Sequence, residues 1–151
     1  MIKLKKMTKK EYKTFIKKSI KRFAKEQIKR GYWLEDEALK EVKAQYKRNL
    51  GKGLKESKFD FYTVHNKSDD KVGYLWLLKE EKMLFIAEIY MCKKYRRQGY
   101  GRALLKKVEK IAKRLKYEKI GLDVSTHNEI AQSLYTQSGF KAISEFRMKR
   151  I

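Results

Sequence analysis

A short basic turn carries the residue types best suited to binding chemistry, Arg96-Arg97-Gln98-Gly99-Tyr100-Gly101-Arg102. It follows an apolar run and precedes a helical pattern that begins near Ala103, so the spacing predicts strand, turn and helix. Two glycines separated by one residue let a backbone take positive φ and pass close to a ligand. Three arginines and a helix N-terminus are expected to face the same point. Such a turn attracts phosphate.

Two other kinds of phosphate loop do not fit this turn. The third glycine of a dinucleotide-binding fingerprint is missing, and so is the Gly-Lys-Ser/Thr of a P-loop. What remains is Arg96-x-x-Gly99-x-Gly101 entering a helix directly after a strand. Consecutive free N–H groups in such a turn can hold a pyrophosphate, although an ordinary strand-to-helix turn has the same pattern.

A second candidate for chemistry lies in the strand before the turn. Glu88 is the only acid in the otherwise apolar run Met83–Met91. An acid in a central strand faces solvent, forms an ion pair or has a function. Tyr90 lies two residues further on and therefore shares its strand face.

The composition indicates a folded protein that carries an unusual charge. The chain has 151 residues, of which 42% are hydrophobic and 38% charged, and a net charge of +22. A nucleic-acid-binding role is one explanation of that charge, but lysines are spread along the chain with no basic block beside stacking aromatics, which favours solvated faces. The two histidines and Cys92 have no recognisable metal-ligand spacing. Without an apolar run of about 18 residues, we expect a soluble cytoplasmic protein.

Hydrophobic periodicity predicts the elements that position these residues. Thr8 and Glu11 have capping-box spacing at the start of the first helix. The expected strands cover residues 2–7, Lys58–His65, Val72–Lys79, Met83–Cys92, Lys119–Ser125 and Phe140–Arg150, and the expected helices cover residues 8–28, Glu35–Asn49, 103–115 and Asn128–Ser138. This order, β-α-α-β-β-β-α-β-α-β, predicts one α/β domain over residues 1–151. Its mixed, mostly antiparallel sheet has helices on both faces, and Lys119–Ser125 runs parallel to Met83–Cys92.

Two motifs together resemble a known family. The run from Ile89 to Leu105, followed by Asn128-x-x-Ala131-x-x-Leu134-Tyr135-x-x-x-Gly139-Phe140, is similar to the GNAT superfamily of acyl-CoA-dependent N-acetyltransferases. The resemblance implies that backbone N–H groups from Arg97 to Arg102 cradle the pyrophosphate of coenzyme A, with Arg96 at the leading position. One departure is Lys93, where many relatives have proline; we expect a looser turn that still binds.

The resemblance also implies roles around the thioester. The strand end at Met91 would splay from its parallel neighbour, and the Met91 amide would face the thioester carbonyl. Asn128 would contact the pantetheine side, and Tyr135 would protonate the departing thiolate. Glu88 would act as the base for the amine or bind a cationic substrate. His127 is a weaker candidate base, and Cys92 is expected to be an inert packing residue.

These inferences lead to one hypothesis and two alternatives. The hypothesis is an acetyl-CoA-dependent N-acetyltransferase that transfers the acetyl group directly, in a ternary complex, to a primary amine on a small cationic molecule or a peptide. The alternatives are a non-catalytic acyl-CoA-binding sensor and a basic nucleic-acid-binding domain. Exposed strand edges and aromatic helices are compatible with a homodimer, although the sequence does not set the oligomeric state.

Overall fold

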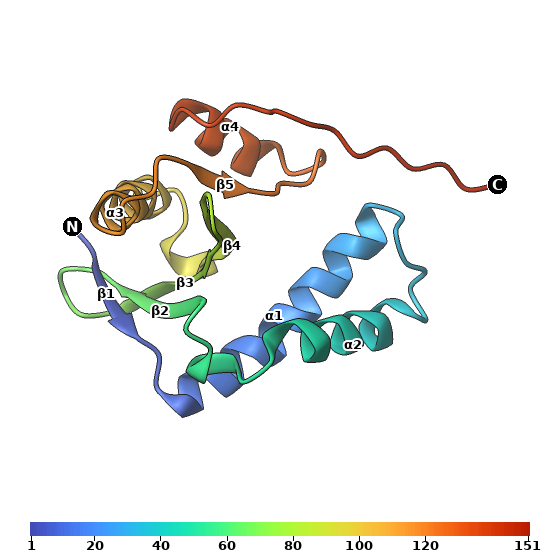
Figure 1. The fold of residues 1–151 in the computed structure, drawn as a ribbon, viewed down its shortest axis with the longest axis horizontal. Helices are drawn as coiled ribbons and strands as arrows, with labels where there is room; N and C mark the ends of the chain where they lie inside the picture. Colours follow the sequence, from blue (N-terminus) through green and yellow to red (C-terminus); the bar gives the residue numbers. More distant parts are fainter.

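A computed structural model describes residues 1–151 as a five-stranded sheet with helices packed around it (Figure 1). The strands are β1 (Lys3–Lys6), β2 (Phe59–His65), β3 (Lys71–Lys79), β4 (Leu84–Met91) and β5 (Ile120–Leu122). The α-helices are α1 (Lys9–Lys29), α2 (Ala38–Leu50), α3 (Tyr100–Arg114) and α4 (Glu129–Gln137). Two short 3₁₀ turns, η1 (Gly53–Lys55) and η2 (Lys93–Tyr95), complete the set. No helix combines the length and the apolar character needed to cross a membrane.

The sheet has the expected mixed topology. Its strands follow the order β1-β2-β3-β4-β5, and the first four pair antiparallel in a meander. β5 pairs parallel to β4, as the strand-helix-strand series predicts. It is shorter than expected, because only Ile120 to Leu122 have partners on β4. The α/β fold class predicted from the sequence is confirmed.

Local signals in the sequence explain where the helices begin and end. Thr8 caps α1 by accepting from the Glu11 N–H at 3.1 Å, and the Glu11 carboxylate accepts from the Thr8 N–H at 3.0 Å, which completes the predicted capping box. The C-cap of α2 is Gly51, whose φ of 54° is accessible to glycine without a Cβ clash.

Apolar side chains form separate clusters around the sheet. The largest packs α3 against the sheet through Leu104, Leu105 and Val108, which meet Leu75, Leu77 and Leu84 of the strands. A second, aromatic cluster joins α1 to β2 and contains Phe15, Phe59 and Phe61. A third lies between α1 and α2. The helices therefore cover both faces of the sheet, and β4 is held between them.

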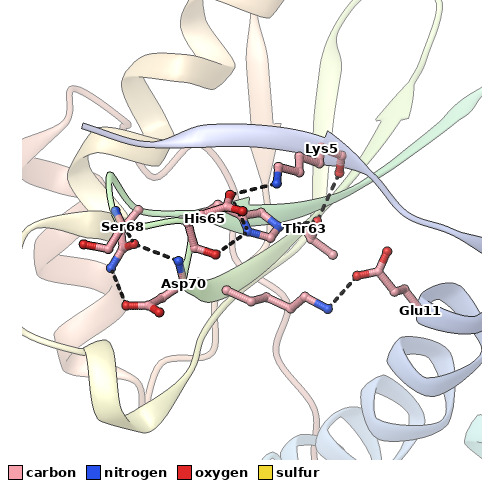
Figure 2. A network of polar contacts seen from close by, with 9 residues as sticks. Lys5, Glu11, Thr63, His65, Ser68 and Asp70 are labelled. Atoms are coloured by element: carbon pink, nitrogen blue, oxygen red, sulfur yellow. Dashed lines mark hydrogen bonds and ion pairs between the residues drawn. The ribbon is translucent and has the colours of Figure 1, made fainter.

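A polar network joins β1, the β2–β3 turn and the start of α1 (Figure 2). His65 is buried and exchanges a hydrogen bond with Thr63 at 3.0 Å, while Lys5 pairs with Asp69 at 2.7 Å across the β2–β3 turn. Lys71 donates to Glu11 and so ties β3 to the start of α1. His65 is thus a structural histidine.

The last predicted strand, Phe140–Arg150, is wrong. Residues 140–151 form no helix or strand, and Figure 1 shows them running from α4 past the end of α1 without joining the sheet. The period-two pattern correctly indicated an extended backbone. A strand, however, also needs a neighbour with which to share its ladder of hydrogen bonds, and this segment has none in its own chain.

Candidate active site

β4 and the edge strand β5 part partway along β4. Their pairing ends at Ile86 and Leu122, so the part of β4 from Ala87 to Met91 has a strand neighbour only on the β3 side. The expected splay of these strands is therefore present. It coincides with a β-bulge, because Trp76 pairs with Glu88 while the next residue, Leu77, pairs with Ile86.

The bulge decides which way the Glu88 side chain points. Leu84 and Ile86 pack in the cluster beneath α3. Strict alternation would send Glu88 into that same apolar cluster. The extra residue, Ala87, shifts the alternation by one, so Ile89 and Met91 continue the apolar face. Glu88 emerges on the opposite face, against α1.

The Met91 amide points into the gap between the strands. Cys92 donates its N–H to the Val72 carbonyl at 2.9 Å, toward β3. Because N–H directions alternate along a strand, the N–H of Met91 points away from β3. The Met91 carbonyl faces the same way and accepts a hydrogen bond from Arg96 Nε at 2.9 Å.

The basic turn presents a run of free backbone amides. The N–H groups from Arg97 to Arg102 donate no hydrogen bond within the chain, and the first bond of α3 is from Ala103 to Gly99. Arg97 and Gly99 have φ values of 64° and 84°, which places both in the left-handed region. Left-handed residues beside a helix start turn successive N–H groups toward one point, which makes an anion-binding nest. The positive φ at Arg97, a residue with a Cβ, marks local strain of the kind found at ligand sites.

The side chains of the turn depart from expectation. The three arginines do not all face one point, because Arg96 lies over the Tyr90 ring at 5.3 Å while Arg102 bonds Gln137 of α4 at 2.7 Å. Gln98 donates to the Lys94 carbonyl at 3.1 Å. The side chains of Arg96, Gln98 and Arg102 therefore brace the turn.

The two glycines have different roles. Gly99 is the N-cap of α3 and supplies the positive φ. Gly101 lies within α3, where an added Cβ would stand 3.1 Å from a methyl carbon of Leu134. It therefore allows α4 to approach α3, and it does not line the turn through positive φ.

Glu88 is held in a polar network that the sequence alone did not indicate. Its carboxylate accepts from Ser19 Oγ at 2.6 Å and from Arg22 Nε at 2.8 Å, both on α1. Arg22 also lies over the Tyr90 ring at 4.1 Å. Ser19 is buried and shares a second hydrogen bond with Tyr46, and burial raises the pKa of Tyr46 to about 12. Glu88 is therefore ion-paired, and both of its oxygens have donors.

A polar stripe on α1 was missed from the sequence. Ser19, Arg22, Glu26 and Arg30 follow one another at spacings of three and four residues, so they share one face of the helix. The signal was present as a second periodicity beneath the apolar one. The C-terminal half of this stripe contacts the chain that follows β5. Arg30 donates to Ser125 Oγ at 2.6 Å, and Ser125 donates to Glu26 at 2.8 Å.

The stripe also gives His127 a partner. His127 Nε2 lies 3.0 Å from the Glu26 carboxylate, so this histidine is not the isolated loop residue that the sequence indicated. The α1 stripe thus contacts β4 through Glu88 and the chain after β5 through Ser125 and His127. The stripe therefore bridges β4 and the chain after β5, which separate from one another beyond Ile86 and Leu122.

α4 brings the second motif to the basic turn. Leu134 meets Gly101, and Gln137 accepts from Arg102, so α4 is fixed against the start of α3. Tyr135 packs edge-on to Phe140 with ring centres 5.8 Å apart, and burial raises the pKa of its hydroxyl. Asn128 caps α4 by accepting from the Ala131 N–H at 3.2 Å.

Comparison with known proteins agrees with this geometry. The family model described as the acetyltransferase (GNAT) family matches residues 20–140. An uncharacterized N-acetyltransferase of Bacillus subtilis, YdgE, is 30% identical over 97% of this chain and 96% of its own. A second one from the same organism, YycN, is 27% identical over 99% of both chains.

Solved structures extend the likeness to the whole fold. The crystal structure of YycN superposes with a TM-score of 0.94 over 100% of this chain and 99% of its own. A predicted acetyltransferase from Clostridium acetobutylicum, solved with acetyl-CoA, shares 17% identity and a TM-score of 0.63 over 99% of this chain and 96% of its own. Family model, relatives and fold agree, and the chain belongs to the GNAT family of acetyltransferases.

Proposed function

We propose that this protein transfers the acetyl group of acetyl-CoA directly to a primary amine in a ternary complex. The observation that carries the proposal is the continuous run of unpartnered amides from Arg97 to Arg102, at the end of a strand that has parted from its neighbour. Acetyl-CoA supplies an activated acyl group as a thioester. GNAT enzymes use this donor, and the Clostridium protein of the same fold was solved with it.

The residues present fit coenzyme A in two places. The amides of the turn offer donors to a pyrophosphate, and the dipole of α3 adds to their attraction. The free side of β4 from Ala87 to Met91 offers backbone groups to the amide groups of the pantetheine arm. The Met91 N–H would donate to the thioester oxygen, where negative charge develops during acyl transfer.

Tyr135 is our candidate for the proton donor to the departing thiolate. A general acid must carry its proton at the working pH. Burial raises the pKa of this phenol above its ordinary value, so the hydroxyl is protonated throughout the neutral range. α4 holds the residue close to the turn through the Leu134 and Gln137 contacts.

The amine is expected to lie between the α1 stripe and β4. A primary alkylamine with a pKa near 10.4 must lose a proton before it attacks. Because Ser19 and Arg22 already occupy the Glu88 oxygens, proton transfer through a water fits its contacts better than direct transfer from the amine. The ion pair with Arg22 also balances the charge of Glu88, which argues against a site built for strongly cationic acceptors. The pair His127 and Glu26 is a second candidate base.

A thiol-release assay with acetyl-CoA and a panel of amines tests the proposal. The panel should contain polyamines, aminoglycosides, amino acids and peptides with free N-termini. Wild type is compared with Glu88→Gln and with Asp60→Asn, which removes a carboxylate paired with Lys79 elsewhere on the sheet. We expect the wild type and Asp60→Asn to acetylate at least one amine, and we expect Glu88→Gln to lose that activity. Coenzyme A release that no amine stimulates would contradict the transfer.

A further inference from the structure

The chain uses only part of the Arg22 guanidinium. Its Nε donates to Glu88 Oε2 at 2.8 Å, and its two Nη groups donate no hydrogen bond within the chain. Nη2 is also buried. A guanidinium is always charged, and its N–H donors form a rigid fork. Because a buried donor without an acceptor is unfavourable, the fork of Arg22 calls for an acceptor that the chain does not supply.

The Tyr90 ring brings a second guanidinium to the same place. Arg22 lies over this ring at 4.1 Å and Arg96 at 5.3 Å. Arg96 donates from its Nε to the Met91 carbonyl at 2.9 Å, and its Nη groups have no partner in the chain. The two positive groups repel each other, and Glu88 is the only acid that pairs with either of them. The surroundings of Tyr90 therefore carry more positive than negative charge.

This excess of positive charge lies where the acceptor is expected. Glu88 is the candidate base, and Arg22 is its direct neighbour. An amine that gives its proton to Glu88, directly or through a water, therefore places the substituents of its own carbon beside Arg22. The side chains of Arg22 and Glu88 are 24% and 20% exposed, so a small molecule can reach the pair. A small shift of the Tyr90 ring, which lies over the guanidinium, would uncover Nη2.

We infer that the acceptor carries a carboxylate on the carbon next to its amine, as a free α-amino acid does, and that Arg22 binds this carboxylate through its Nη fork. The inference rests on the proposed acetyl transfer and narrows its acceptor. An amino-acid zwitterion is the charge complement of the Glu88–Arg22 pair, because its ammonium faces the acid and its carboxylate faces the arginine. A carboxylate accepts two parallel N–H bonds from a guanidinium, whereas the carboxamide that follows a peptide N-terminus offers one oxygen and no charge.

Paired substrates test the carboxylate during turnover. Free glycine, leucine, phenylalanine, lysine and glutamate are compared with their α-carboxamides, and the ratio of kcat/KM for each acid to kcat/KM for its amide is measured. The variant Arg22→Lys keeps a positive charge beside Glu88 but removes the fork. Its matched control, Arg48→Lys, makes the same exchange at an exposed position of α2.

We expect the ratio to fall by roughly tenfold or more in Arg22→Lys and to stay within about twofold of the wild type in Arg48→Lys. The amine of an amide is less basic than the amine of the acid. That difference belongs to the substrates and is the same for every variant, so it cancels when the ratios are compared.

Calorimetric titration with the acetylated products gives a readout that needs no turnover. N-acetyl amino acids and their amides are titrated into the protein with coenzyme A present. We expect the acids to bind roughly tenfold or more tightly than the amides in the wild type and in Arg48→Lys, and we expect this preference to disappear in Arg22→Lys.

Three results would overturn the inference. They are no binding of any acid, equal binding of acids and amides in the wild type, and a preference that survives in Arg22→Lys. Acetylation of polyamines or peptides but not of amino acids would also overturn it, while the proposed acetyl transfer would stand. If no amine at all were acetylated, the proposed transfer would fail instead, and the titration would still decide whether Arg22 binds a carboxylate.

Discussion

Gly99 should strengthen coenzyme A binding through its backbone conformation, and this effect can be separated from its effect on stability. Its φ is 84°, and an added Cβ would meet no atom closer than the Met1 methyl carbon at 3.9 Å. Alanine is therefore not excluded by crowding. It costs about 1–2 kcal/mol because an L residue disfavours the left-handed region. Relief of that strain would rotate the amides on either side of Gly99 away from the nest.

Gly31 provides the matched control. It also has positive φ, 74°, and open space around a Cβ, but it ends α1 and lies outside the turn. Gly99→Ala and Gly31→Ala should each lower Tm by about 2–8 °C, given about 2–4 °C per kcal/mol for a chain of this size. Only Gly99→Ala should weaken coenzyme A binding, because a hydrogen bond to a charged group contributes about 1.5–3 kcal/mol.

Calorimetric titration with coenzyme A measures the difference. Losing one such bond corresponds to a roughly 10- to 150-fold rise in Kd for Gly99→Ala. Gly31→Ala should bind as wild type does. If the two variants lost the same stability and both kept wild-type affinity, the nest would not be the binding site.

Three other predictions follow from single contacts. Tyr135→Phe should lower kcat about 100-fold or more while the Kd for coenzyme A stays unchanged, since only the proton donor is removed; an unchanged kcat over the full pH range would exclude this role. Thr8→Ala should cost about 1 kcal/mol of stability through loss of the α1 cap, seen as a Tm lower by about 2–4 °C with activity intact; an unaltered Tm would show that the cap is dispensable. Because burial raises the pKa of Tyr46 to about 12, its contribution to stability is complete below the ordinary tyrosine value near pH 10 and is lost as the pH rises toward 12. Tm measured from pH 8 to 12 should fall less steeply in Tyr46→Phe than in the wild type. Parallel curves of Tm against pH would show that ionisation of Tyr46 does not destabilise the fold.

The sequence predicted well those features that depend on local backbone chemistry. Thr8 with Glu11 marked the start of α1, Gly99 marked the turn, and Asn128 lay at the start of α4. Each of these signals depends on residues that lie within a few positions of one another, so a single sequence is enough to reveal it. The parallel placement of β5 followed from the chain order.

Features that depend on tertiary partners were harder to predict. The ion pair of Glu88 with Arg22 joins residues far apart in the sequence. The bulge at Ala87 did leave a local trace, because the apolar positions change from Leu84 and Ile86 to Ile89 and Met91. The tail was predicted as a strand because its side chains alternate, but alternation does not supply the neighbouring strand that a ladder of hydrogen bonds needs.

The central claim is that the bare amides of the basic turn hold the pyrophosphate of coenzyme A, and backbone NMR during an acetyl-CoA titration tests it most directly. The amide signals from Arg97 to Arg102 and that of Met91 should shift together with one binding constant, while those of the β3–β4 turn around Glu81, at the opposite end of β4, stay in place. Binding without shifts in the turn, or with the largest shifts on the α1 stripe, would contradict the account.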